Sequence, residues 1–162
     1  MVFDPVLFVF LAIPVYVANS TPLLFSKVRV LGFLDLPIDR KKFFMGERLL
    51  GDGKTLKGFV LGLLSGSFAG LILGASFLGF LLSLGVVVGD LLGSFIKRRF
   101  RIKRGRQWFW DSIFFVVFAL VFASSFFSVS WEYWLILLIL SPLIHRLANV
   151  LAFHSGLKNV KY

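Results

Sequence analysis

The feature that most constrains this chain is an apolar run from Phe59 to Ile96 that contains a single charged residue, Asp90. One helix over this run would be about 57 Å long, nearly twice the roughly 30 Å hydrocarbon core of a bilayer. The run therefore predicts two membrane helices in sequence. We expect the chain to reverse near residues 74–79, where Gly, Ala and Ser cluster and the backbone can turn.

Three further apolar segments complete a pattern of five predicted spans. Hydrophobic residues make up 58% of the chain and charged residues only 16%, against about 45–50% and 25% in ordinary globular proteins. A soluble globule is therefore excluded, and we expect an all-α integral membrane protein with a single transmembrane domain over residues 1–162. The five spans are predicted at residues 6–25, 59–74, 79–96, 112–127 and 131–153.

The basic residues predict how the protein is oriented. Of 18 Lys and Arg, eight lie in the loop 26–57, seven lie in the loop 97–110, and three lie in the last third of the final span or beyond it. The other side carries only Asp4 and Glu132. Because cytoplasmic loops are enriched in Lys and Arg, we expect the N-terminus outside and both loops and the C-terminus in the cytoplasm, in the cell membrane.

Glycines recur every four residues along the second and third predicted spans. Such stripes let membrane helices approach closely, either within one chain or between two chains, so a homodimer is conceivable. The absence of cysteine excludes disulfides and thiolate metal sites. The glycines of the two stripes are Gly58, Gly62, Gly66, Gly70 and Gly74, and Gly85, Gly89 and Gly93.

Ionisable side chains within spans cost about 2.5–3.5 kcal/mol on insertion scales, so each indicates a function or a partner. Asp90 is predicted roughly 10 Å below the inner interface, on a stripe that continues through Ser94 to Lys97. Asp111 opens the fourth span. Two alternatives stay open: Asp90 could be a structural acid neutralised by Arg146, and Asp111 could be a helix N-cap.

Other polar groups are expected at the same depth. Pro22 leaves the carbonyl of Ala18 without its helical donor, beside Asn19. His145 and Asn149 are one turn apart and could simply form hydrogen bonds between helices. The basic loops could likewise serve only to bind anionic lipid headgroups, although that reading does not explain the two buried acids.

Two carboxylates beside a cationic funnel suggest a hard cation that is shared with a polyphosphate, since Mg2+ commonly binds one or two carboxylates plus substrate phosphates. The run GDGKTLKG over residues 51–58 suits wrapping backbone N–H groups around phosphate. It is not a P-loop, because Arg48 stands where the first Gly is required and no strand precedes it. We expect no nucleic acid partner.

The segment Ser94–Arg98, with Lys103 after it, Asp90 before it and Asp111 beyond, resembles the signature of the CTP-dependent phosphatidate cytidylyltransferase family. The GDGKT-x-KG run, together with Asn19 and the short five-span length, is similar to its archaeal branch, the CDP-archaeol synthases. The resemblance implies transfer of the cytidylyl group of CTP to the phosphate of a di-geranylgeranyl glycerol ether lipid, with release of pyrophosphate and with Mg2+ as cofactor.

On this basis we hypothesise that Asp90 and Asp111 hold Mg2+ and that Lys97 is the third catalytic residue. A lipid phosphate has a second pKa of about 6, so it is already an anionic nucleophile at neutral pH and needs no general base. A CDP-alcohol phosphotransferase and a small non-enzymatic transporter remain alternatives. The expected CTP-binding residues are Asn19, Lys54, Thr55, Lys57, Gly58, Ser94, Lys97, Arg98 and Lys103.

Overall fold

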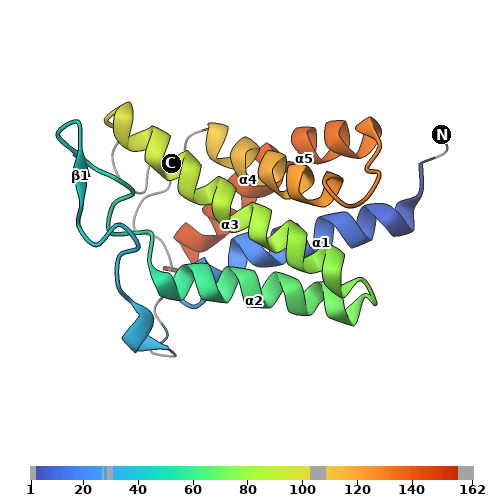
Figure 1. Ribbon diagram of the computed structural model, residues 1–162, viewed down its shortest axis with the longest axis horizontal. Helices are drawn as coiled ribbons and strands as arrows, with labels where there is room; N and C mark the ends of the chain where they lie inside the picture. The colour runs from blue at the N-terminus through green and yellow to red at the C-terminus, as the bar shows by residue number, and fades with distance from the viewer. Residues whose placement is uncertain (1–2, 27, 29–30, 103–108, 157–162) are drawn as a thin grey trace.

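The computed structural model describes residues 3–26, 28, 31–102 and 109–156. In this part, five α-helices run roughly side by side, with the N-terminus at one end and the loop between the first two helices at the other (Figure 1). This confirms the all-α, five-helix prediction. The helices are α1 (Pro5–Leu24), α2 (Leu56–Ile72), α3 (Ser76–Arg99), α4 (Phe109–Ser124) and α5 (Trp131–His154).

Helices α1, α3 and α5 are long and apolar enough to cross a membrane, whereas α2 and α4 are shorter apolar helices. The reversal between α2 and α3 occupies residues 73–75, at the near edge of the predicted region. Gly74 turns the chain with a φ of +76°, a left-handed conformation that glycine adopts without a Cβ clash. Helix α3 therefore begins three residues before the predicted span.

The glycines of α2 allow it to lie against both α1 and α3. A Cβ added to Gly62 would lie 2.9 Å from the carbonyl oxygen of Ala18, which Pro22 deprives of its helical donor. A Cβ added to Gly70 would lie 2.5 Å from the Cα of Gly79 on α3. Real Cβ atoms do not approach so closely, so only glycine fits at these positions.

The glycines of the second stripe allow α3 to pack closely against α4. A Cβ at Gly85 would lie 2.5 Å from the Cα of Ala119, and one at Gly89 would lie 2.5 Å from the carbonyl oxygen of Phe114. The contact is looser at Gly93, where the nearest atom is a ring carbon of Phe114 at 3.4 Å. These glycines pack within one chain, so their spacing lends no support to a homodimer.

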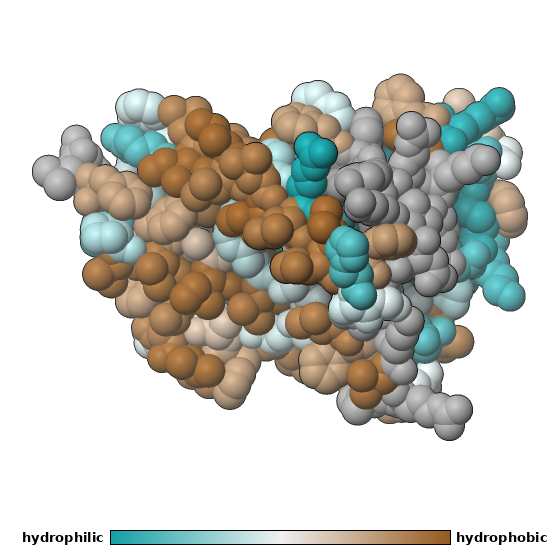
Figure 2. All heavy atoms as spheres, turned by 180° about the vertical axis from the view of Figure 1, so that it is seen from behind, coloured by the Kyte–Doolittle hydropathy of each residue, from teal (hydrophilic) through white to brown (hydrophobic). Residues whose placement is uncertain are grey.

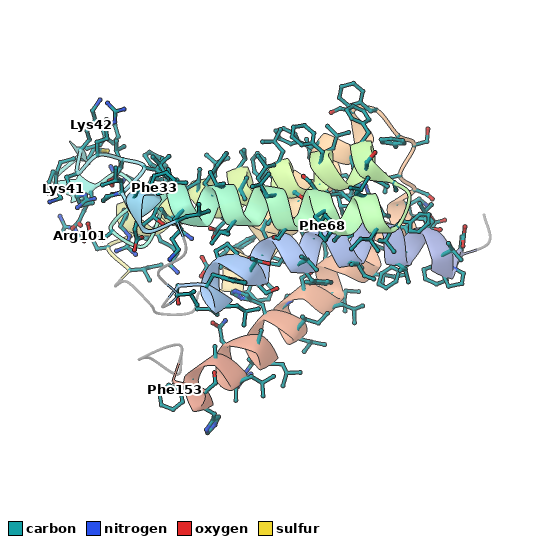
Figure 3. The ribbon with its side chains drawn as sticks, turned by 90° about the horizontal axis from the view of Figure 1, so that it is seen from below. Phe33, Lys41, Lys42, Phe68, Arg101 and Phe153 are labelled. Atoms are coloured by element: carbon teal, nitrogen blue, oxygen red, sulfur yellow. The ribbon has the colours of Figure 1, made fainter. Side chains whose placement is uncertain are left out.

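The core lies where α1, α3, α4 and α5 come together, with α3 packed against α1 and α4 and with α5 packed against α4. Helix α5 is joined to α1 by a hydrogen bond of 2.8 Å between the hydroxyls of Tyr16 and Ser141. It diverges from the other helices toward its C-terminal end, where Phe153 lies (Figure 3). The fully buried core side chains include Leu11, Val15, Leu82, Val86, Phe115, Val116, Leu120 and Leu137.

The loop between α1 and α2 has a structure of its own, which the sequence did not predict. A short 3-10 helix (Gly32–Leu34) precedes an antiparallel hairpin of β1 (Phe43–Phe44) and β2 (Glu47–Arg48). Hydrophobic side chains dominate the helical body, while hydrophilic side chains gather toward the end that carries this loop (Figure 2). The charged residues are thus concentrated at one end of the bundle.

Candidate functional site

Two carboxylate–lysine pairs stand at the charged end of the bundle. Nζ of Lys54, from the loop before α2, lies 2.5 Å from Oδ2 of Asp90 on α3. Nζ of Lys97, near the end of α3, lies 2.7 Å from Oδ2 of Asp111 on α4. The Asp90 side chain is 45% exposed and that of Asp111 is 19% exposed, so the first is open to a ligand and the second is recessed.

The packing of α3 on α4 explains why these acids share one end of the fold. Gly89 lies against the backbone of Phe114, and Asp90 follows Gly89 directly. Asp111 comes one helical turn before Phe114, in the first turn of α4. The structure places both acids at the charged end of the bundle, and the sequence did not predict their lysine partners. Asp90 forms its ion pair with Lys54, whereas one alternative from the sequence was a pair with Arg146.

The loop that carries Lys54 is held by a buried carboxylate, Asp39. Its side chain is fully buried and accepts two hydrogen bonds from the guanidinium of Arg48, at 2.6 and 3.2 Å. It also accepts hydrogen bonds from the backbone N–H groups of Leu50 and Gly51, at 3.1 and 3.0 Å. The first residues of the GDGKT run are thereby fixed to the rest of the loop.

Burial alone would raise the pKa of Asp39, but the hydrogen bonds from Arg48, Leu50, Gly51 and Lys41 outweigh it and hold the pKa well below its usual range. A carboxyl whose pKa falls on folding contributes stability above its unfolded pKa of about 3.9, and that stability is lost as pH falls through the folded pKa. Sequence reasoning missed Asp39. The available signal was an acid within a strongly basic loop.

We expect the Asp39→Asn variant to loosen the loop at neutral pH. Asn keeps the size of the side chain but removes the negative charge that Arg48 binds and one of the two acceptor oxygens that hold Arg48, Leu50 and Gly51. Hydrogen–deuterium exchange over residues 39–54 should become faster in the variant, while exchange in α3 stays unchanged. In the wild-type protein, hydrogen–deuterium exchange over the same residues should become faster only below about pH 4, where the stability contributed by the Asp39 carboxylate begins to be lost. Unchanged exchange in the variant would contradict this assignment.

Two arginines at the end of α3 have different surroundings. Arg99 binds the hairpin, donating hydrogen bonds to the carbonyls of Phe44 and Arg48 at 2.5 and 2.8 Å. Arg98 lies beside Gly51, and its buried Nε, like that of Arg99, has no hydrogen-bond partner among the described residues. A buried guanidinium nitrogen without an acceptor suits an anionic ligand, since buried polar groups are normally hydrogen-bonded.

A cavity of about 210 Å³ adjoins the start of α2, between the GDGKT run and Pro22. Thr55 caps α2, its hydroxyl accepting a hydrogen bond from the amide of Gly58 at 3.2 Å. Lys57 is only 5% exposed and donates to the carbonyl of Val28 at 2.6 Å. Three residues predicted to bind CTP thus line one cavity, although Lys57 is already engaged with the backbone.

The remaining predicted residues are dispersed. Asn19 is half-buried on α1, and Ser94 is half-buried on α3 one turn after Asp90. Lys103 lies outside the described residues. The Asn149 amide donates to the carbonyl of His145 within α5, at 2.8 Å, which makes it a hydrogen bond within one helix.

The donor set fits a metal that is shared with substrate. In the part of the chain that the structure describes, no cluster of three or more His, Cys, Asp or Glu residues could hold a metal alone. Asp90 and Asp111 offer hard oxygen ligands, which suit Mg2+ when phosphate oxygens and waters complete its coordination. The two acids therefore fit Mg2+ whose coordination is completed by phosphate oxygens and water, and the described residues form no metal cage by themselves.

Comparisons with known proteins agree over nearly the whole chain. A family model described as CarS-like, CDP-archaeol synthase, matches residues 2–162. The CDP-archaeol synthase of Methanococcus aeolicus is 37% identical, covering 94% of this chain and 93% of that protein. That of Pyrococcus horikoshii is 42% identical, covering 93% and 92%. A solved structure of an intramembrane enzyme for archaeal membrane lipids biosynthesis aligns with a TM-score of 0.70 at 31% identity, over 88% of this chain and 92% of that one.

The five-helix fold with its charged end defines a class, that of small all-helical intramembrane enzymes. Within this class, the extent of the family match and the identity to its relatives decide the assignment. The chain belongs to the CDP-archaeol synthase family. It is accordingly an enzyme of the cytidylyltransferase type, which excludes the phosphotransferase and transporter alternatives.

Proposed function

We propose that this protein transfers the cytidylyl group of CTP to the phosphate of a di-geranylgeranyl glycerol ether lipid, giving the CDP-lipid and pyrophosphate. The observation that carries the proposal is the presence of two carboxylate–lysine pairs, Lys54–Asp90 and Lys97–Asp111, at one end of a membrane helix bundle. Each pair holds one group suited to a metal and one suited to a phosphate. Membership of the family supports the reaction class.

The reaction asks little of the protein beyond binding and charge neutralisation. An oxygen of the lipid phosphate, anionic at neutral pH, attacks the α-phosphorus of CTP. The bond from that phosphorus to the bridging oxygen of the β-phosphate breaks, and pyrophosphate leaves with the electron pair. No general base is required. The developing charge on the leaving group must instead be met by fixed positive groups.

The cations of the site supply those positive groups. Lys54 and Lys97 are each held by a carboxylate in the structure, and Arg98 has a buried nitrogen free to donate. We assign these three to the triphosphate, with Lys103 as a further ligand. Asn19, Ser94, Thr55 and Gly58 shape the surroundings of the nucleotide, while Lys57 fixes the cavity wall through its bond to Val28.

Asp90 and Asp111 would hold Mg2+, which when bound neutralises charge between the phosphates. Each acid would then exchange its lysine for the metal. The freed Lys54 and Lys97 would pass to phosphate oxygens. In the structure each pair places a carboxylate next to a lysine, which limits the free-energy cost of desolvating either charged group alone.

The site faces the cytoplasm of the cell in this proposal. Seventeen of the 18 basic residues belong to the loops and the tail that the sequence assigns to one side, and the other, Arg146, lies in the C-terminal half of α5. In the structure residues 31–55 and the C-terminal end of α3 lie at the same end of the bundle (Figure 1). The positive-inside rule then directs this end to the cytoplasm, where CTP is made available, and the lipid phosphate reaches it from the inner leaflet of the cell membrane.

An omission experiment tests the proposal. Purified protein in nanodiscs is incubated with CTP, Mg2+ and a di-geranylgeranyl glycerol phosphate, and pyrophosphate is measured. Release should require the lipid phosphate and the metal, and it should fall when CTP is replaced by UTP, ATP or GTP. Pyrophosphate release without the lipid phosphate, or no release in the complete mixture, would contradict the assigned reaction.

A further inference from the structure

The tip of the β1–β2 hairpin presents apolar side chains to the outside of the molecule. Phe43 is 68% exposed, Phe44 is 51% exposed and Met45 is 78% exposed. Lys41 and Lys42, also exposed, come immediately before β1. Figure 3 shows both lysines at the charged end of the bundle, beyond the helical body. A tip of this composition lies outside the two carboxylate–lysine pairs, so those pairs do not account for it.

The turn of the hairpin places a methionine in a backbone conformation that its side chain disfavours. Met45 and Gly46 have φ of +52° and +78°, as the two central residues of a type I′ turn do. Asn, Asp or Gly is strongly preferred at the first of these positions, and a side chain such as Met is an outlier there. Met45 is exposed, apolar and in a strained backbone conformation, which indicates that its side chain contacts something outside the hairpin.

The position of the tip identifies that contact. Arg99, in the last turn of α3, donates to the carbonyl of Phe44, and its guanidinium lies over the rings of Phe44 and Phe95 at 5.2 and 4.9 Å from their centroids. The rings of Phe44 and Phe95 are themselves stacked, 6.4 Å apart. Leu92, 37% exposed, lies one turn before Phe95 on the same side of α3.

Leu92, Phe95 and Phe44 therefore lead from the exposed side of a membrane helix to the hairpin tip, with the guanidinium of Arg99 against both rings. The outward side chains of a membrane helix face lipid. A surface that continues them, with Arg99 and the two lysines at its outer edge, matches the border between the hydrocarbon and the headgroups. Aromatic residues collect at this border, and Lys and Arg favour anionic headgroups there.

We propose that the hairpin tip, Phe43–Met45 with Lys41 and Lys42, is a membrane-surface anchor. Its aromatic and thioether side chains enter the interfacial layer of the leaflet at the charged end of the bundle, and its lysines bind anionic lipid headgroups. The anchor fixes β2, whose Arg48 binds Asp39 and Asp52. Contact with the bilayer thereby holds the loop that presents Lys54.

The chain allows a direct test because it has no cysteine. A nitroxide is attached to a Met45→Cys variant in nanodiscs, and its accessibility to oxygen is compared with that to a water-soluble nickel complex. Phe68→Cys on α2, 61% exposed on the helical body, is the lipid reference. Arg101→Cys, at an exposed charged position beyond the end of α3 (Figure 3), is the aqueous reference. The label at position 45 should give an oxygen-to-nickel ratio several-fold above the aqueous reference, and a ratio equal to that reference would overturn the proposal.

Two further comparisons separate contact with lipid from contact with a second copy of the chain. With Lys41→Gln and Lys42→Gln together, the label should become more accessible to nickel in anionic nanodiscs and unchanged in zwitterionic ones; no difference between the two lipids would overturn the role of the lysines. Shielding from nickel that is present only when two copies of the chain share a nanodisc, and is lost when each nanodisc holds one copy, would indicate a second copy of the chain rather than lipid, and would also overturn the proposal. With the label moved to Phe43→Cys, adding Met45→Asn should raise nickel accessibility while the hairpin keeps its slow hydrogen exchange, since Asn suits the turn.

Discussion

Replacing Asp90 with Asn is expected to lower turnover by roughly 100-fold or more. The charge stabilisation that a bound metal provides is worth several kcal/mol, and each 1.4 kcal/mol or so is tenfold in rate. Asn keeps the size of the side chain but removes the anionic oxygen. The measurement is the rate of pyrophosphate release as Mg2+ is varied, with Glu47→Gln as a matched control on the same end of the bundle. Turnover near the wild-type level in the variant would contradict the metal assignment.

A double variant separates the metal role of Asp90 from a structural one. Asp90 also neutralises Lys54, so Asn alone leaves a lysine uncompensated. If neutralising Lys54 were the whole role of Asp90, the double variant Asp90→Asn with Lys54→Met should be as active as Lys54→Met alone. We expect instead that the double variant is far less active than Lys54→Met alone. Equal rates in the double variant and in Lys54→Met would identify the acid as structural.

Replacing Gly85 with Val is expected to prevent α3 from seating on α4. A Cβ at this position would lie 2.5 Å from the Cα of Ala119 and 2.6 Å from its backbone nitrogen. Backbone atoms cannot give way as the end of a flexible side chain can, and overpacking of a well-packed core costs about 1–3 kcal/mol or more. The thermal midpoint in detergent should fall by several degrees, with loss of activity.

Gly93→Ala is the matched control on the same helix and the same stripe. Its added Cβ would meet a ring carbon of Phe114 at 3.4 Å, which a small ring movement relieves. The thermal midpoint of this variant should stay within a degree or two of the wild type. Equal destabilisation by Gly85→Val and Gly93→Ala would mean that the close approach of α3 and α4 is not what these glycines provide.

The sequence predicted the helices well because their signals are local and large. A lipid-facing helix needs a long apolar run, and the run from Phe59 to Ile96 was too long for one span, so a reversal had to follow. The four-residue spacing of glycine predicted close helix packing, which the contacts at Gly62, Gly70 and Gly85 confirm. The choice between packing within and between chains needed coordinates.

The charged end was predicted only in part, because its contacts join segments far apart in the chain. Asp90 and Asp111 stand out as acids beside apolar helices. Nothing in the sequence reveals that Lys54, rather than Arg146, meets Asp90, since that pairing depends on the path of the loop. That path depends in turn on Asp39 and on a hairpin whose strands have two residues each, too short for an alternating pattern.

The most direct measurement follows the position of the label in CTP. The protein is given CTP radiolabelled at either the α- or the γ-phosphate, together with Mg2+ and the ether lipid phosphate, and the lipid is extracted. Cytidylyl transfer predicts that the α-label enters the lipid and that the γ-label stays in water as pyrophosphate. Transfer of the γ-label to the lipid, or of neither label, would contradict the proposed reaction.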